Sequence, residues 1–353
     1  MSYAEESRRQ AEAIRKKEHV RILAIESSCD ETAAAVIEDG RRILSNAVFT
    51  QIDLHALYGG VVPEIASRAH VEKVDRMVDQ ALREAGMALQ DVDAIAVTCG
   101  PGLVGALLIG VSCAKALAFA AHKPLIPVNH IEGHICANFL TDLSLAPPFA
   151  CLVVSGGHSH LFSVEDYGVY RIIGQTQDDA AGEAFDKAAR VLNIPYPGGP
   201  LLDKLAEEGD PRALKLPRPK TEGRYDYSFS GLKTAFINAV HNARQKGEAL
   251  HDADLAASFR QAVVAFLVDK AMLAADDLNL KKMALAGGVS ANRLLRREMQ
   301  RACDKRGIQL YMPQLSLCGD NAAMIGSAAY YRLLRGEIAD LTLNARPALR
   351  LSL

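Results

Sequence analysis

Two histidines one helical turn apart are the residues of this chain whose type and spacing most directly indicate chemistry. His130 and His134 come directly after the apolar segment Pro124–Val128. On a helix, residues four positions apart lie on one face, so the two rings can reach the same ion. Neutral imidazole is the commonest protein ligand for metals. The spacing therefore indicates a metal-binding pair, although helix-face histidines without an ion have the same spacing.

A carboxylate late in the chain offers a third ligand. Asp320 and Asn321 precede an apolar helix that we expect over 322–334. Either residue is typical of a helix N-cap, but a carboxylate at a helix start is also a hard metal ligand. His130, His134 and Asp320 together would hold one divalent ion and leave positions open for a substrate. The ligand set suits Zn²⁺ and Fe²⁺ equally.

Two glycine-rich segments can hold an anion. Ser155-Gly156-Gly157 lies between two apolar runs, and glycine lets backbone N–H groups approach a phosphate. An ordinary hairpin turn has the same composition. Gly287-Gly288 follows a short strand and precedes a helix expected over 293–306. The chain has no GxGxxG and no GxxxxGK[ST] motif, which disfavours a Rossmann dehydrogenase and a P-loop ATPase.

The elements that must position these residues form two similar halves. Each half is expected to open with a strand, a polar tip and a return strand: 21–26, 27–32 and 33–37 in the first, and 149–154, 155–159 and 160–164 in the second. This repetition predicts duplication of one α/β unit. We therefore expect two ribonuclease-H-like lobes of the actin, sugar-kinase and Hsp70 type, with a nucleotide cleft between the lobes. The predicted divisions are a tail over 1–20, an N-terminal α/β lobe over 21–129, a C-terminal α/β lobe with the metal and nucleotide site over 130–335, and an extension over 336–353.

Composition limits the class of protein further. The 353 residues are 49% hydrophobic and 23% charged, with no Trp and 6% aromatic residues, which predicts a globular protein with an aliphatic core. The net charge of −2 gives no global basic field for nucleic acid. The seven cysteines lack CxxC pairing, so we expect free, buried thiols in a reducing cytoplasm.

The N-terminal segment and one long uncharged segment bear on localisation. Residues 1–21 carry six Lys/Arg, four Glu and no apolar run, so we expect a frayed helix or a disordered tail and no targeting signal. Residues 94–114 carry no charge and are long enough to span a membrane. The Gly and Pro residues at 100–102 interrupt them, however, so we expect a strand at 94–97, a loop and a buried helix from residue 104. The chain is predicted to be cytoplasmic and to have no membrane partner.

Seven motifs in order give the chain a family resemblance. They begin at His130, Ser155, Asp178, Tyr196, Ser228, Gly287 and Cys318, and read HIEGH, SGGHS, DDAAGEAFDK, YPGGP, SFSGLKT, GGVSAN and CGDN. With them, the region from Arg21 to Leu334 resembles the bacterial type of the tRNA N6-adenosine threonylcarbamoyltransferase family, formerly described as O-sialoglycoprotein endopeptidases. Several long motifs in one order make this resemblance specific, whereas each motif alone is not.

The resemblance implies a reaction, a cofactor and partners. Members transfer a threonylcarbamoyl group from threonylcarbamoyl-AMP to N6 of adenosine 37, 3′ of the anticodon, in tRNAs that read ANN codons, and release AMP. His130, His134 and Asp320 would hold one divalent metal, Fe²⁺ or Zn²⁺. The implied partners are tRNA, a small inactive paralogue that dimerises with the enzyme, and a small P-loop ATPase. The residues implied to bind threonylcarbamoyl-AMP or another adenine nucleotide are Val154, Ser155, Gly156, Gly157, His158, Asp186, Gly199, Asp203 and Asn292.

Several of the implied site residues have a second interpretation. Asp186 and Asp203 would accept hydrogen bonds from ribose hydroxyls, or would be helix-surface acids. Asn292 would bond the adenine or ribose, or would be the N-cap of the helix that follows it. Asp30 and Glu31, at the tip of the first hairpin, would orient the attacking amine or assist removal of its proton, or would be solvated turn acids.

Two basic segments are candidates for tRNA contact. Residues 211–224 hold five Lys/Arg and lead into Tyr225, Tyr227 and Phe229, a combination that suits backbone contact and base stacking. The helix at 293–306 carries six Lys/Arg against two acids, which is also typical of a solvated helix face. Lys233 is a further candidate for phosphate contact.

Other functions compete with the transferase interpretation. A metallopeptidase needs the Glu of HExxH next to the first His, but Ile131 stands there and Glu132 lies about 100° further round the helix. A 2-His-1-carboxylate iron oxygenase site normally lies in a β-barrel, and the α/β alternation of this sequence does not indicate one. A non-enzymatic scaffold of the Hsp70 or actin type would not need the three ligands. His158 and His160 share a strand face, which leaves a second metal site as an alternative.

Overall fold

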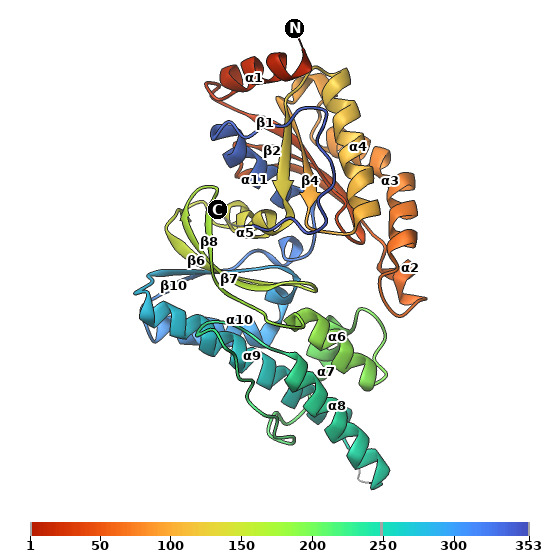
Figure 1. Cartoon of the computed structure of the whole chain (residues 1–353), viewed down its shortest axis with the longest axis vertical. Helices are drawn as coiled ribbons and strands as arrows, with labels where there is room; N and C mark the ends of the chain where they lie inside the picture. The colour runs from red at the N-terminus through yellow and green to blue at the C-terminus, as the bar shows by residue number, and fades with distance from the viewer. Residues whose placement is uncertain (1, 248–249, 352–353) are drawn as a thin grey trace. The chain divides into compact units, whose positions relative to one another are not determined.

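The computed structural model describes residues 2–247 and 250–351, which form two compact α/β units (Figure 1). The first unit comprises Met1–Ala146, Tyr167–Val169 and Pro313–Leu353, and the second comprises Pro147–Asp166 and Tyr170–Met312. The division differs from the predicted one at 129/130, because the segments that carry the two histidines and Asp320 both pack in the first unit. Residues 336–351 also belong to the first unit.

The sheet of the first unit has the strand order β3-β2-β1-β4-β5. β1 pairs antiparallel with β2 and parallel with β4, and β4 pairs parallel with β5. The strands are β1 Arg21–Glu26, β2 Glu31–Glu38, β3 Arg42–Thr50, β4 Ala94–Gly100 and β5 Leu125–Asn129. The predicted first hairpin and the strand at 94–97 are confirmed. β3 was not predicted, because its partly exposed residues give no continuous apolar run.

Helices cover both faces of this sheet. On β1, Leu23 packs in one hydrophobic cluster with Val111 of α4, whereas Ala24 lies against Gly326 of α11. Side chains that alternate between two covered faces are typical of a buried strand. The helices of the first unit are α1 Tyr3–Ile14, α2 Ile52–Ala56, α3 Pro63–Glu84, α4 Val104–Ala120, α5 His130–Thr141 and α11 Ala322–Leu334, with 3₁₀ turns at Leu89–Asp91 and Leu315–Leu317.

The second unit repeats the topology of the first. Its sheet has the order β8-β7-β6-β9-β10, in which β6 pairs antiparallel with β7 and parallel with β9, and β9 pairs parallel with β10. The corresponding strands of the first sheet have the same order, and the three corresponding pairs β1–β2, β1–β4 and β4–β5 have the same directions, which confirms the predicted duplication. The strands are β6 Phe149–Val154, β7 Ser159–Asp166, β8 Val169–Gln175, β9 Lys282–Ala286 and β10 Gln309–Tyr311.

The core of the second unit is largely aliphatic and alanine-rich, with a smaller group of aromatic rings. The long helix α9 contributes many buried side chains to this core, such as Phe259 and Leu267. The helices of this unit are α6 Ala181–Val191, α7 Gly198–Leu205, α8 Ser230–Gln245, α9 Asp252–Asp277 and α10 Arg293–Asp304, with a 3₁₀ turn at Gly288–Ala291.

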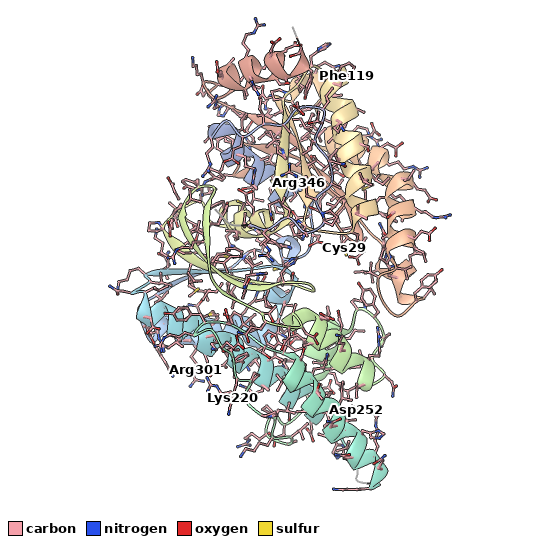
Figure 2. All side chains as sticks on the ribbon, viewed as in Figure 1. Cys29, Phe119, Lys220, Asp252, Arg301 and Arg346 are labelled. Carbon is pink, nitrogen blue, oxygen red and sulfur yellow. The ribbon has the colours of Figure 1, made fainter. Side chains whose placement is uncertain are left out.

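The uncharged segment and the N-terminal segment both fold into elements of the first unit. The uncharged stretch at 94–114 forms β4 and the first part of α4, as predicted, and none of the described helices has the length and apolar character of a membrane span. A reciprocal pair of hydrogen bonds between Ser2 and Glu5 caps α1, which buries Ala11 and Ile14. Residues Tyr3–Ile14 therefore form a capped, packed helix and are not the frayed helix or disordered tail that was predicted. None of the seven cysteines, all within the described ranges, forms a disulfide, but Cys29 (Figure 2) and Cys113 are only partly buried.

Candidate active site

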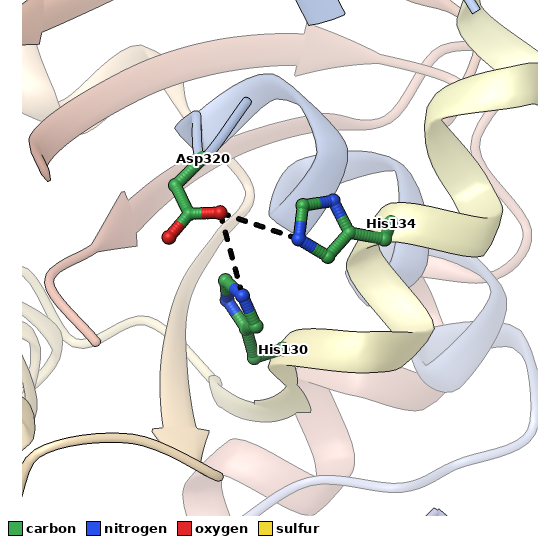
Figure 3. A group of neighbouring side chains, drawn as sticks. All are labelled: His130, His134 and Asp320. Carbon is green, nitrogen blue, oxygen red and sulfur yellow. Dashed lines mark ion pairs between the residues drawn. The ribbon is translucent and has the colours of Figure 1, made fainter. Parts of the chain in front are cut away.

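His130, His134 and Asp320 converge in the first unit (Figure 3). The Oδ1 atom of Asp320 lies 3.2 Å from Nε2 of His134 and 3.5 Å from Nε2 of His130. Zinc–ligand distances of about 2.0–2.2 Å at tetrahedral angles place neighbouring ligand atoms about 3.3–3.6 Å apart. The three side chains therefore have the spacing of a ligand set around one ion.

Two helix starts position these three side chains. The side chain of Asn129 accepts from the N–H groups of Ile131 and Glu132 at 2.8 Å and 3.4 Å, so α5 begins at His130. The side chain of Asn321 accepts from the N–H of Met324 at 3.0 Å and caps α11. Asn321 is therefore the N-cap, and the capping interpretation of the Asp320 carboxylate is wrong.

The environment of His134 fits a metal ligand. Its side chain is fully buried, and neither ring nitrogen makes a hydrogen bond, although Nε2 lies close to Asp320. Buried polar atoms normally have a partner, because an unsatisfied one loses the free energy of its hydration. A divalent ion that accepts the lone pair of Nε2 would supply such a partner. Two imidazoles and one carboxylate are donors that Zn²⁺ and Fe²⁺ both accept.

Negative charge dominates the surroundings of the ligands. Burial opposes protonation of His130, but the carboxylates of Asp320 and Glu26 raise the pKa of its imidazole to about 9. Burial, together with the charges of Asp320 and Asp30, raises the pKa of Glu31 to about 10. Both shifts reflect an excess of negative charge in a buried place, which a bound divalent cation would compensate.

The turn between β1 and β2 carries the predicted acids Asp30 and Glu31. Asp30 is only 8% exposed, so it is not a solvated turn acid. The imidazole of His70 on α3 holds the turn, because its Nδ1 lies 2.7 Å from the hydroxyl of Thr32 and its Nε2 lies 2.9 Å from the carbonyl oxygen of Cys29. Burial lowers the pKa of His70, which favours the neutral ring that can accept at one nitrogen and donate at the other.

The turn between β6 and β7 presents backbone N–H groups. The carbonyl oxygens of Ser155 and Gly156 accept from the N–H groups of Gly182 and Glu183 at the start of α6, at 3.2 Å each. Because these peptide bonds are trans, the N–H groups of Gly156 and Gly157 lie on the side away from α6. A Cβ added at either glycine would meet no atom within 4 Å. Successive N–H groups of this kind form an anion-binding concavity.

The two residues that flank this turn have different environments. Val154 ends β6 and is fully buried, while the carbonyl oxygen of His158 accepts from the N–H of Ser155 at 2.8 Å and closes the turn. The rings of His158 and His160 have centroids 5.6 Å apart. Among the residues that the structure describes, no third His, Cys, Asp or Glu completes a ligand group with them, so a second metal site there has no support.

The remaining predicted nucleotide residues form two connected groups. The carboxylate of Asp186 accepts from the N–H of Gly199 at 2.9 Å and thereby joins α6 to α7. The carboxylate of Asp203 accepts from Asn292 at 2.8 Å and from Arg260 at 2.9 Å. Asn292 also caps α10, as the alternative interpretation predicted. Asp203 is therefore a mostly buried acid that holds the start of α10.

The prediction that Tyr227 and Phe229 contact tRNA is wrong. Tyr227 and Phe229 are fully buried in the core of the second unit, so they cannot stack on a base. Lys233 forms an ion pair with Asp179 at 2.5 Å. Arg301, by contrast, is exposed on α10 (Figure 2). The basic face of α10 thus remains a candidate for phosphate contact.

Glu132 argues against a peptidase mechanism. Its carboxylate is 1% exposed and accepts from Nε of Arg332 at 2.6 Å. An acid committed to a buried ion pair is poorly placed to activate a water molecule.

Two residues near the candidate site were not predicted from the sequence. They are Glu26, whose carboxylate lies 3.3 Å from Nδ1 of His130, and His70, which holds the first turn. The only sequence signals are an acid at the end of an apolar strand and a histidine on an amphipathic helix, and both are common without a function.

Solved structures show the class of fold. The chain has the α/β fold of the actin, sugar-kinase and Hsp70 type, as predicted. The structure of T. kodakarensis HypF has a TM-score of 0.60 and 15% identity, and the match covers 90% of this chain and 48% of that one. A full-length HypF in a phosphate- and nucleotide-bound form has a TM-score of 0.59 and 15% identity, with 89% and 46% covered. At such low identity the likeness shows the fold alone.

Sequence relatives show the family. The model of the tRNA N6-adenosine threonylcarbamoyltransferase family matches residues 42–327. Proteins of that name from Clostridium perfringens and Clostridium botulinum are 55% and 53% identical to this chain. The first match covers 94% of this chain and 98% of the C. perfringens protein. The second covers 95% of this chain and 99% of the C. botulinum protein. The chain belongs to the tRNA N6-adenosine threonylcarbamoyltransferase family, so it is a transferase whose substrate is tRNA, and the predicted resemblance is confirmed.

Proposed function

We propose that this chain transfers a threonylcarbamoyl group from threonylcarbamoyl-AMP to N6 of adenosine 37 in tRNAs that read ANN codons, and releases AMP. Membership of the family supports the transfer and the tRNA substrate. At the level of the site, the observation that carries the proposal is the convergence of His130, His134 and Asp320 on one point. The charge of Asp320 contributes to the raised pKa of Glu31, which supports placing the acidic turn at the same site.

The proposed reaction is an acyl transfer to a weak nucleophile. A bond forms between N6 and the carbamoyl carbon, and the bond from that carbon to a phosphate oxygen of AMP breaks. N6 loses one proton, and AMP leaves with the electron pair of the broken bond. A divalent metal, Fe²⁺ or Zn²⁺, held by His130, His134 and Asp320 would supply Lewis-acid polarisation of the carbonyl and a template for the substrate. Asp30 or Glu31 would orient the amine or accept its proton.

We assign the adenylate to residues of the second unit. The N–H groups of Gly156 and Gly157 would hold the phosphate, because both lie on the open side of their turn. Asp186 and Asp203 would then act partly by positioning α7 and α10, since their carboxylates already accept hydrogen bonds from the protein. The proposed adenylate-binding residues are Val154, Ser155, Gly156, Gly157, His158, Asp186, Gly199, Asp203 and Asn292.

The proposed system includes further partners. The basic face of α10, with the exposed Arg301, would contact the tRNA backbone. A small inactive paralogue would dimerise with this chain, and a small P-loop ATPase would complete the complex. The family resemblance is the basis for both proteins and for a cytoplasmic location.

Transfer with purified components tests this function. The protein, supplied with threonylcarbamoyl-AMP, unmodified tRNA, the two partner proteins and either Fe²⁺ or Zn²⁺, should produce N6-threonylcarbamoyladenosine and release one AMP for each transfer. Mass spectrometry of tRNA nucleosides measures the product, and metal analysis of the purified protein distinguishes the two ions. If cells depleted of this protein kept the same content of N6-threonylcarbamoyladenosine, the proposed function would be wrong.

A further inference from the structure

A fully buried carboxylate lies beside the proposed metal ligand His130, next to the ring nitrogen that does not face Asp320. Glu26 is the last residue of β1 and is 0% exposed. Its Oε2 atom lies 3.3 Å from Nδ1 of His130, whereas the other ring nitrogen, Nε2, lies 3.5 Å from Asp320. The imidazole of His130 therefore stands between two carboxylates, with one nitrogen directed to each.

Two donors from the sheet hold Glu26 in place. Its Oε1 accepts from the N–H of Ser28 at 2.6 Å, and its Oε2 accepts from the hydroxyl of Thr98 on β4 at 2.5 Å. A buried carboxylate is costly unless hydrogen bonds compensate its lost hydration. With these bonds the carboxylate has a fixed orientation before any ligand binds.

The partner of Nδ1 decides which nitrogen of His130 can bind a metal. An ionised carboxylate can only accept, so Glu26 requires a proton on Nδ1 and leaves the lone pair of the neutral ring on Nε2. The hydroxyl of Ser28 also lies 3.1 Å from Nδ1. A hydroxyl that donated to Nδ1 would select the opposite tautomer, with the proton on Nε2, where it would block metal binding.

We propose that Glu26 is a positioning residue that fixes the proton of His130 on Nδ1, so that Nε2 is available to the divalent metal. The inference rests on the proposed metal site and extends it to a residue outside the three ligands. Carboxylates that hold a ligating histidine in this way typically contribute about 10–100-fold to metal affinity.

Glu132 offers a matched control on the helix that carries both histidines. It is also a buried carboxylate, at 1% exposure, but it forms an ion pair with Arg332 at 2.6 Å. The substitutions Glu26→Gln and Glu132→Gln make the same chemical change at nearly equal burial. Only the first alters the partner of a ligating ring.

Zinc affinity of the full-length protein, measured by competition with a chromophoric chelator, tests the inference. In Glu26→Gln, the N–H of Ser28 keeps an acceptor if the amide oxygen faces it, so the amide NH₂ would face His130 and favour the wrong tautomer. We expect Zn²⁺ affinity to fall about 10–100-fold in Glu26→Gln and to stay within about threefold in Glu132→Gln. Unchanged affinity in Glu26→Gln, or equal losses in both variants, would overturn the inference.

A measurement on the unsubstituted protein removes the dependence on how the variants fold. In the Zn²⁺-loaded protein, the ¹⁵N chemical shifts of His130 should show a proton on Nδ1 and a metal-bound Nε2. A metal-bound Nδ1 would refute the role of Glu26 while leaving the metal site intact. Absence of Zn²⁺ and Fe²⁺ binding by the unsubstituted protein would instead refute the proposed metal site, and the inference with it.

Discussion

The turns β1–β2 and β6–β7 occupy the same place in two copies of one topology, yet they present opposite charge. The first turn carries the acids Asp30 and Glu31, whereas the second presents the backbone N–H groups of Gly156 and Gly157. One turn is therefore suited to a cation or an amine, and the other to a phosphate. The shared topology does not decide the chemistry of a turn.

Both turns are held by backbone hydrogen bonds. The carbonyl oxygens of Ser28 and Asp30 accept from the N–H groups of Leu103 and Gln51, and those of the second turn accept from the first N–H groups of α6. Only in the first turn does the structure also show a histidine side chain that bonds to two turn residues, because His70 bonds to both Thr32 and Cys29. The residue types at the tips, acids in one and glycines in the other, set the difference in charge. The two turns should therefore respond to different substitutions.

Loss of a proposed metal ligand in the first unit should have the largest effect. His134→Ala should abolish metal binding and lower the transfer rate by about a thousandfold or more, because two donors remain where three are needed. Binding of AMP should change little, since the proposed adenylate-binding residues belong to the second unit. Metal analysis, single-turnover transfer and AMP titration check the three statements. His241→Ala, at an exposed position of α8, is the control, and full transfer by metal-free His134→Ala would contradict the prediction.

A methyl group should distinguish the two sides of the second turn. In Gly182→Ala the Cβ would lie 2.5 Å from the carbonyl oxygen of Ser155, so we expect a loss of about 1–3 kcal/mol in the free energy of unfolding and weaker AMP binding. In Gly156→Ala the Cβ meets open space, so stability should hold, while AMP binding should weaken about tenfold because the methyl group crowds the N–H side.

Urea denaturation and AMP titration check the predictions for Gly182→Ala and Gly156→Ala. Gly231→Ala is the control, because its Cβ would also meet open space. Wild-type AMP affinity in Gly156→Ala would show that the phosphate does not lie against this turn.

The smallest of these effects should come from the hydroxyl that bonds to His70. Thr32→Val removes that hydroxyl and leaves Nδ1 of a buried imidazole without its partner, so the free energy of unfolding should fall by about 1–2 kcal/mol. Urea denaturation measures the change. The same substitution at Thr234, whose hydroxyl makes an exposed bond within α8, should cost less than about 0.5 kcal/mol. Equal losses at both positions would mean that His70 does not hold the first turn.

Much of the fold was predictable because its signals are local. Apolar runs bounded by turn residues predicted β1, β6 and the strand–loop–helix at 94–114, and the repeated hairpin predicted the duplication. β3 was not predicted, because a strand with one partly exposed face has a weaker apolar signal. The alternation of Tyr225, Tyr227 and Phe229 with basic residues was misleading, since composition does not reveal which side of a loop packs into the core.

The sequence by itself determined which groups are available: two histidines one turn apart, paired glycines after strands, and the motifs that identify the family. Each depends on residues close together in the chain, where helix and strand geometry fix the spacing. The family resemblance also predicted that Asp320 joins His130 and His134, and the structure places the three side chains together. Only the tertiary structure decided that Asn321 is the cap, that Glu26 contacts His130 and that His70 contacts the first turn. Those contacts join distant segments through packing, and no local pattern of residue types specifies which distant side chains will meet.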